Sequence, residues 1–211
     1  MKKLLHIIAT PRGEESRTLK VSRAFLHAFA AGHPYWVVEE LDLFKEELPP
    51  LSAKRVDGKY MLLEGQDLYG SLREAWGDII AQIERFLSAD GYVISTPMWN
   101  YSVPYVLKQY IDIIIQPKYM FRDTEHGSEG MARGRRMVVV NTCGGTYASE
   151  SARHRDFVEP YLRTAFRLAG IEDITFVRAA GMDSSEEDAK QRALAAAQEQ
   201  ARVVARDWPA G

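Results

Sequence analysis

The sequence has little cysteine, no long apolar run and almost no net charge. Its single cysteine, Cys143, excludes an intramolecular disulfide and any metal site built from several thiolates, and it fits a reducing compartment. No stretch approaches the roughly 18 apolar residues that a membrane span requires. The 27 basic and 29 acidic residues give a net charge of −2, which argues against a nucleic-acid-binding face.

The amino terminus imitates a signal peptide only superficially. Two lysines precede a short apolar segment, but His6 interrupts it, and Pro11 follows with no small-residue cleavage site. We therefore expect a buried strand here and a protein that remains in the cytoplasm. The 211 residues, 46% of them hydrophobic, suffice for one domain, residues 1–211, with a full core.

Short apolar runs alternate along the chain with segments of helical periodicity. The apolar runs predict strands at residues 4–9, 36–43, 91–95, 137–140 and 175–178. Helical spacing predicts helices at residues 16–31, 72–87, 103–115, 157–169 and 186–206, the last a surface helix. No strand is evident after the proline pair at 49–50, and residues 116–134 form an excursion too long for a connector. The alternation predicts an α/β fold, a five-stranded parallel sheet with helices on both faces.

Ligands of such sheets bind beyond the carboxyl ends of the strands. Three segments that follow predicted strands carry polar or aromatic side chains: residues 10–18, 97–101 and 142–145. We expect these segments to converge on one ligand.

The first segment, residues 10–18, is suited to a phosphate monoester. It offers hydroxyl groups at Thr10, Ser16 and Thr18, together with Arg17 and the free N–H groups of a predicted helix start. Hydroxyls, backbone N–H groups and the helix dipole all favour a bound phosphate, provided that the two glutamates of the segment face solvent. Alternatively, Ser16 is only a helix cap. The spacing matches neither the NTPase phosphate loop nor the dinucleotide-binding glycine motif.

The second segment, residues 97–101, places aromatic side chains around an amide. Trp99 and Tyr101 can form a wall against a flat ring, and Asn100 can hydrogen-bond the heteroatoms of that ring. Prolines bracket the segment and fix the loop. Alternatively, Trp99 only covers the helix behind it.

The third segment is Thr142-Cys143-Gly144-Gly145. It can bring backbone N–H groups close to a ligand, because neither glycine has a side chain. Such donors suit an atom that becomes anionic during reduction. Alternatively, the glycine pair is only a turn. Cys143 has no neighbouring cysteine or histidine, so we do not expect a nucleophile there.

Several other kinds of site have no support in the sequence. The five histidines show no metal-ligand spacing, so we expect no metal. The Gly-x-Ser-x-Gly motif is absent, which removes the simplest hydrolase. The arginines at positions 133, 135 and 136 indicate a solvated turn before a strand.

The most specific motif of the chain is Thr96-Pro97-Met98-Trp99-Asn100-Tyr101-Ser102, followed by Leu107-Lys108-Gln109-Tyr110-Ile111-Asp112. Further motifs lie at residues 121–127 (FRDTEHG), 142–145 (TCGG) and 159–162 (EPYL). Together, over nearly the whole chain, they resemble the FMN-dependent NADH-azoreductase and quinone-reductase family. The resemblance implies a flavodoxin-like three-layer sandwich with strand order 2-1-3-4-5. It also implies a homodimer that binds one FMN per subunit at the dimer interface.

The resemblance implies roles for individual residues. The implied cofactor-binding residues are Thr10, Ser16, Arg17 and Thr18 for the FMN phosphate, Pro97, Met98, Trp99, Asn100 and Tyr101 for the isoalloxazine ring, and Thr142, Cys143, Gly144 and Gly145 for its pyrimidine side and the ribityl chain. Asn100 and the backbone donors of Gly144 and Gly145 are the implied catalytic groups. Tyr147 and Phe121 of the partner subunit are the implied substrate-binding residues.

The implied activity is the two-electron reduction of quinones and azo compounds, with nitroaromatic compounds as a further class. NADH or NADPH is the donor, and a ping-pong mechanism is expected. The chain departs from the family at residues 11–15, at Cys143, where arginine is common, and after Gly145. These departures leave the acceptor and the nicotinamide preference open. Tyr147, His126 or water would supply the proton.

Other functions fit the same fold. A flavodoxin-type electron carrier is typically strongly acidic, whereas this chain has a net charge of −2. A phosphate-accepting signalling module needs acidic residues after its first strand, where Ile8-Ala9-Thr10 stands. A flavin-binding redox sensor remains an open alternative.

Overall fold

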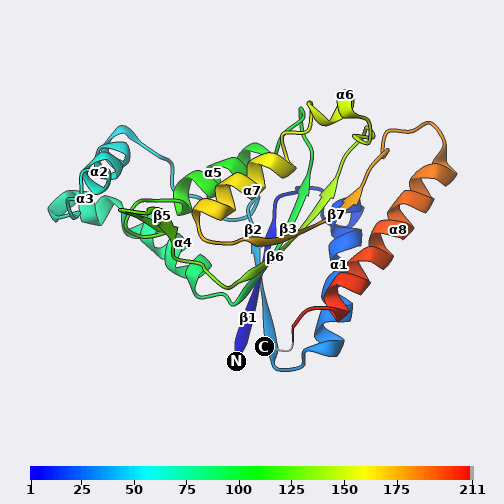
Figure 1. The fold of residues 1–211 in the computed structure, drawn as a ribbon, viewed down its shortest axis with the longest axis horizontal. Coiled ribbons are helices and arrows are strands. Elements are labelled where there is room, and N and C mark those ends of the chain that lie inside the picture. Colours follow the sequence, from blue (N-terminus) through cyan, green and yellow to red (C-terminus); the bar gives the residue numbers. More distant parts are fainter. Residues whose placement is uncertain (210–211) are drawn as a thin grey trace.

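Five parallel strands form the centre of the molecule (Figure 1). The computed structural model describes residues 1–209. Their order in the sheet is β2-β1-β3-β6-β7, formed by Trp36–Asp42, Lys2–Ile8, Gly91–Pro97, Arg136–Thr142 and Asp173–Ala179. The predicted α/β fold with a five-stranded parallel sheet is confirmed. The order differs from 2-1-3-4-5 in numbering, because two further strands lie outside this sheet.

Helices cover both faces of the sheet (Figure 1). One face carries α1 (Arg17–Gly32) and α8 (Glu187–Arg206), which pack against each other. The other face carries α4 (Gly77–Leu87), α5 (Tyr105–Ile114) and α7 (Glu159–Leu168). The predicted strands and most predicted helices are therefore present, with their ends displaced by a residue or two.

Successive strand residues face two separate hydrophobic cores. Leu4 and Val93 pack in the core beneath α1 and α8, whereas their neighbours Leu5 and Ile94 pack in the core beneath α4, α5 and α7. This alternation follows from the period of two in a β-strand. Because the central strands are buried on both faces, their sequences are almost continuously apolar.

The last helix, α8, is more than the surface helix that its composition suggested. Ala197, Ala201 and Ala205 are buried at a spacing of four residues. Small side chains at this spacing let α8 lie close against α1. The charged residues that alternate with the alanines occupy the remaining, exposed face.

The predicted helix at residues 72–87 is wrong, because two helices occupy the region. The first, α3 (Gly70–Ala75), ends at Trp76, and α4 starts directly afterwards. The Trp76 side chain is fully buried, and its indole N–H donates to the Arg55 carbonyl at 3.1 Å. Arg55 lies in α2 (Ala53–Leu63), a helix that the sequence did not predict. The junction of the two helices thus falls at a residue whose side chain is held in the core, while the Ile80 N–H still donates to the Trp76 carbonyl at 2.9 Å.

The excursion at residues 116–134 holds an antiparallel hairpin, β4 (Phe121–Thr124) and β5 (Gly127–Gly130). Two further short elements were not predicted: the 3-10 helix η1 (Gly13–Glu15) and α6 (Glu150–Arg153). Within residues 1–209, no helix has the length and apolar character needed to cross a membrane.

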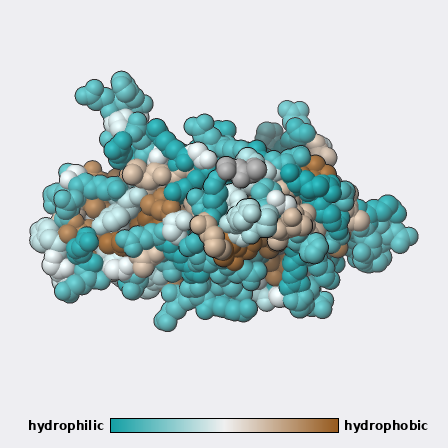
Figure 2. Space-filling model, turned by 90° about the horizontal axis from the view of Figure 1, so that it is seen from below, coloured by the Kyte–Doolittle hydropathy of each residue, from teal (hydrophilic) through white to brown (hydrophobic). Residues whose placement is uncertain are grey.

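Because the five strands are parallel, their amino ends lie along one side of the sheet and their carboxyl ends lie along the opposite side. Seen from below, where β1 begins, the surface is mostly hydrophilic, and its hydrophobic residues gather in small patches (Figure 2). The segments predicted to bind a ligand follow the strand ends, so they lie at the opposite edge (Figure 1).

Candidate functional site

The ends of β1, β3 and β6 surround a cavity of about 210 Å³, which we call the inner cavity. Each of the segments 10–18, 97–101 and 142–145 contributes to its wall. Its lining residues are Thr10, Arg12, Ser16, Arg17, Thr18, Pro97, Met98, Trp99, Thr142, Cys143, Gly144, Met182 and Asp183. Segments far apart in the sequence thus meet beside the carboxyl ends of these strands.

A second cavity of about 450 Å³, the outer cavity, adjoins the first. It is lined by Met98, Asn100, Tyr101, Gly144, Gly145, Thr146, Tyr147, Ala152, Arg155 and Asp183. Met98, Gly144 and Asp183 line both cavities, so the two form one elongated site.

Four buried hydroxyl groups form the polar part of the inner cavity. The Thr10 and Ser16 hydroxyls lie 3.2 Å apart, and those of Thr18 and Thr142 lie 2.6 Å apart. Ser16 also caps α1, because its side chain accepts a hydrogen bond from the Leu19 N–H at 3.3 Å. The two interpretations of Ser16 are therefore compatible: it caps the helix and lines the cavity.

The start of α1 presents unused donors to the same cavity. The N–H of Lys20 is bonded to the Ser16 carbonyl at 3.0 Å, whereas the N–H groups of Arg17 and Thr18 have no acceptor among residues 1–209. The positive end of the helix dipole adds to these donors. Such donors, together with the buried hydroxyls, are suited to an anion.

The two glutamates of the first segment face away from this cavity. Glu14 and Glu15 are exposed, and Glu14 forms an ion pair with Arg23. The hydrogen bond from Arg23 lowers the pKa of the Glu14 carboxyl. Both glutamates thus face solvent, as an anion site at the helix start would require.

Asn100 and Tyr101 form a tight turn at the rim of the outer cavity. Their φ angles are 48° and 70°, in the left-handed region. Trp99 and Ser102 close the turn with hydrogen bonds of 2.9 and 3.0 Å between their backbones. A turn with two left-handed residues normally favours glycine, so the side chains are held there at a conformational cost.

Trp99 does not merely cover the helix behind it. Its ring packs against that of Phe44 at a centroid distance of 6.0 Å, and 36% of its surface stays exposed. Because it also lines the inner cavity, the side chain is available to a ligand.

The third segment offers backbone donors beside a buried thiol. The Cys143 N–H donates to the Ala179 carbonyl at 3.1 Å, whereas the N–H groups of Gly144 and Gly145 have no acceptor in the described part of the chain. Burial raises the pKa of the Cys143 thiol to about 11. At neutral pH this group is a thiol, which agrees with the expectation that it is no nucleophile.

The sequence did not predict one wall of the site, the β7 loop, which we define as Gly181–Asp183. Its three N–H groups donate to carbonyls of the third segment: Gly181 to Gly145 at 3.1 Å, Met182 to Cys143 at 3.0 Å and Asp183 to Gly144 at 3.1 Å. The rule that placed the other segments at the strand ends, applied to the fifth strand, would have found it.

Gly144 is constrained by this loop. A β-carbon at Gly144 would lie 1.8 Å from Oδ2 of Asp183, closer than atoms can approach. At Gly145 the nearest atom, in the ring of Tyr147, would be 3.7 Å away, an ordinary contact. Of the two glycines, only Gly144 leaves no room for a β-carbon while its neighbour stays in place, and that neighbour is the Asp183 side chain.

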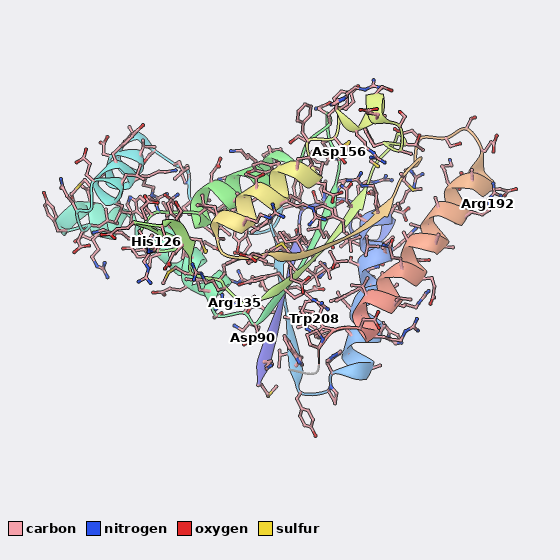
Figure 3. The ribbon with its side chains drawn as sticks, viewed as in Figure 1. Asp90, His126, Arg135, Asp156, Arg192 and Trp208 are labelled. Carbon is pink, nitrogen blue, oxygen red and sulfur yellow. The ribbon has the colours of Figure 1, made fainter. Side chains whose placement is uncertain are left out.

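Two residues named from the sequence lie outside both cavities. Phe121 begins β4, and His126 lies in the turn of the β4–β5 hairpin. In Figure 3, His126 is well separated from Asp156, which lies near α6 beside the site. Tyr147, by contrast, lines the outer cavity.

Ser95, His6 and Glu40, none of which lines either cavity, form a row of polar side chains. Nε2 of His6 lies 2.8 Å from Oγ of Ser95, and Nδ1 lies 3.5 Å from Oε1 of Glu40. The order matches a hydrolase triad, but Ser95 is fully buried within β3. A nucleophile must reach its substrate, so this row is structural. Among residues 1–209, no group of three or more metal-binding side chains occurs.

Comparisons with known proteins agree with this geometry. Residues 2–204 match a family model described as flavodoxin-like fold. An FMN-dependent NADH:quinone oxidoreductase of Nitratidesulfovibrio vulgaris (strain DP4) is 38% identical over 209 residues, which are 99% of this chain and 100% of the relative.

Solved structures show the same similarity. An azoreductase of Bacillus anthracis strain Sterne superposes with a TM-score of 0.88 at 29% identity, covering 99% of this chain and 100% of that chain. An FMN-dependent NADH-azoreductase of Bacillus anthracis strain Ames Ancestor, solved in complex with FMN, has a TM-score of 0.82 at 29% identity, covering 97% and 100%.

Proposed function

The chain belongs to the family of flavodoxin-like fold, and we propose on this premise that it is an FMN-dependent NADH oxidoreductase that reduces quinones and azo compounds. The observation that carries the proposal is the elongated site, with an anion site at one end and an aromatic turn at the other. A mononucleotide with a flat ring has these two ends.

The inner cavity fits the phosphate of FMN. We propose that Thr10, Ser16, Arg17 and Thr18 hold it, since their buried hydroxyls and the unused N–H groups at the start of α1 are phosphate donors. The Arg17 guanidinium donates to the Met182 carbonyl at 2.7 Å and lines the same cavity. Its charge therefore favours an anion while it also fixes the β7 loop.

The outer cavity fits the ring. We propose that the segment Pro97, Met98, Trp99, Asn100 and Tyr101 lines one side of the ring, and that Thr142, Cys143, Gly144 and Gly145 line the other. Pro97, Trp99, Thr142 and Cys143 would reach the ring from the adjoining wall of the inner cavity. The amide of Asn100 makes no hydrogen bond within the described residues and can bond ring heteroatoms. The free N–H groups of Gly144 and Gly145 favour negative charge at this end.

When bound, FMN supplies the two-electron redox chemistry that no amino-acid side chain provides. The chain's own residues bind and orient the reactants. Tyr147 lines the outer cavity, where burial raises the pKa of its phenol. A phenol is protonated at neutral pH whether or not its pKa is raised, and we propose Tyr147 as a proton donor to the reduced acceptor because it lines the outer cavity.

We further propose that the active form is a homodimer, built of one FMN-binding domain, residues 1–211, per subunit. Several large apolar side chains near the site are exposed: Trp99, Tyr101, Tyr105 and Phe157. A second copy covering them would bring Phe121 of the partner subunit toward the substrate. A cytoplasmic location belongs to the same proposal, since the only cysteine is a free, buried thiol.

Steady-state kinetics test the reaction class. We expect NADH to reduce quinones and azo compounds, with nitroaromatic compounds as a further acceptor class and NADPH as an alternative donor. Because donor and acceptor use the same site in turn, double-reciprocal plots should give parallel lines. Converging lines would contradict a shared, sequentially occupied site, and absence of turnover would favour an electron carrier.

A further inference from the structure

The β7 loop brings one carboxylate to the middle of the site. Of all the lining residues, only Met98, Gly144 and Asp183 belong to both the inner and the outer cavity. A ligand with one end in each cavity therefore has its connecting part beside these three residues.

Asp183 is the only one of the three with strong hydrogen-bond acceptors on its side chain. Met98 offers a weakly accepting thioether, and Gly144 has no side chain. Within residues 1–209, the Asp183 carboxylate takes part in no hydrogen bond and no ion pair. Its two oxygens are thus available to a ligand.

The backbone beneath this carboxylate is fixed. The Asp183 N–H donates to the Gly144 carbonyl at 3.1 Å, and the Met182 N–H donates to the Cys143 carbonyl at 3.0 Å. On the other side, Arg17 donates to the Met182 carbonyl at 2.7 Å. These bonds tie the loop to both the segment that follows β6 and the start of α1, and the carboxylate lies against Gly144.

We propose that Asp183 is a positioning residue, which accepts hydrogen bonds from the hydroxyl groups of the polyol chain in the bound mononucleotide. This inference rests on the proposed function, because it takes the phosphate to lie in the inner cavity and the ring in the outer one. A polyol chain is a row of O–H donors, and a carboxylate is purely an acceptor, so the two are complementary.

The charge of Asp183 also has an opposing effect. A carboxylate at the edge of the inner cavity repels a phosphate, and the positive charges of Arg12 and Arg17 in the same wall partly offset this repulsion. The benefit of the carboxylate should therefore be largest for a ligand that has the polyol chain but lacks the phosphate.

Three flavins separate these effects: FMN, riboflavin, which lacks the phosphate, and lumiflavin, which lacks the polyol chain. Each is titrated into the full-length protein freed of flavin, with fluorescence quenching as the readout. We expect Asp183→Ala to weaken riboflavin binding about tenfold, FMN binding less than that, and lumiflavin binding less than twofold. Asp183→Asn, which keeps one acceptor oxygen, should fall between the wild type and the alanine variant for riboflavin.

The matched control is Asp188→Asn, which removes the same charge from the first turn of α8 and lines neither cavity. It should leave all three affinities unchanged. Riboflavin binding that is equal or tighter in both Asp183 variants overturns the inference, while FMN binding by the wild type keeps the proposed function intact. A wild type that binds none of the three flavins overturns both. If the alanine variant fails to fold, the asparagine variant decides.

Discussion

The hydroxyl groups of Thr18 and Thr142 lie 2.6 Å apart and are both buried. Thr18 belongs to the first turn of α1, and Thr142 is the last residue of β6. This hydrogen bond joins two of the three segments that surround the inner cavity, so the anion site depends on tertiary structure as well as on the helix start.

We predict that Thr18→Val weakens FMN binding about tenfold and leaves riboflavin binding nearly unchanged, since the lost hydroxyl lines the cavity that would hold the phosphate. The free energy of unfolding should fall by about 1 kcal/mol, because the buried Thr142 hydroxyl loses its hydrogen-bond partner. Thr164→Val, which removes an exposed hydroxyl from α7, is the control. Flavin titration and urea unfolding measure both effects. Equal losses for FMN and riboflavin would argue against a phosphate at Thr18.

Gly144→Ala should weaken FMN binding by no more than Asp183→Ala does, less than about tenfold, and change the free energy of unfolding by less than about 1 kcal/mol. The added methyl group displaces the Asp183 carboxylate, which is the mobile end of a side chain and can turn away. Gly145→Ala is the matched control, because its methyl group would meet only an ordinary contact at 3.7 Å. Similar FMN affinities for the two variants would contradict the role given to this contact.

The left-handed turn at Asn100 and Tyr101 predicts an unusual order of stabilities. At Tyr101, with φ 70°, the glycine variant should be about 1 kcal/mol more stable than the alanine variant, because glycine adopts this φ without strain. At Tyr105, which starts α5, the order should reverse, since alanine favours a helix. Urea unfolding of the four variants checks both orders. An alanine variant at position 101 that is as stable as the glycine variant, or more stable, would show that the turn stores no strain.

The buried Cys143 thiol predicts a dependence on alkaline pH. Its pKa is about 11 in the folded protein and about 8.5 in an unfolded chain. The stability contributed by burying the neutral thiol is complete below the unfolded value and is lost as pH rises toward 11. Wild type should therefore lose more stability than Cys143→Ser across this range.

Alkylation of this single cysteine provides an independent measurement. Iodoacetamide should react slowly with the folded protein at pH 7–8 and faster as pH approaches 11, because the thiolate is the reactive form. Rapid, stoichiometric alkylation of the folded protein at neutral pH would show that the thiol is accessible and ionised.

Much of the fold follows from local patterns in the sequence. Runs such as Met137–Val140 are apolar at every position because β6 is buried on both faces, and Ser16 marks the start of α1 because it caps that helix. The placement of the site follows from the sheet itself, since parallel strands end at one edge.

Other features depend on contacts between distant residues and leave little trace in the sequence. The junction of α3 and α4 falls at Trp76, whose buried indole donates to the Arg55 carbonyl, a contact that no local pattern reveals. The left-handed turn at Tyr101 has no glycine to reveal it. The constraint on Gly144 comes from the side chain of Asp183, 39 positions along the chain.

An anaerobic titration with NADH tests the central claim most directly. The protein, purified or reconstituted with FMN, should be yellow, and NADH added without oxygen should bleach it within seconds. A subsequent quinone should restore the colour. A protein that cannot take up FMN, or a yellow one whose colour NADH leaves unchanged, would contradict the account.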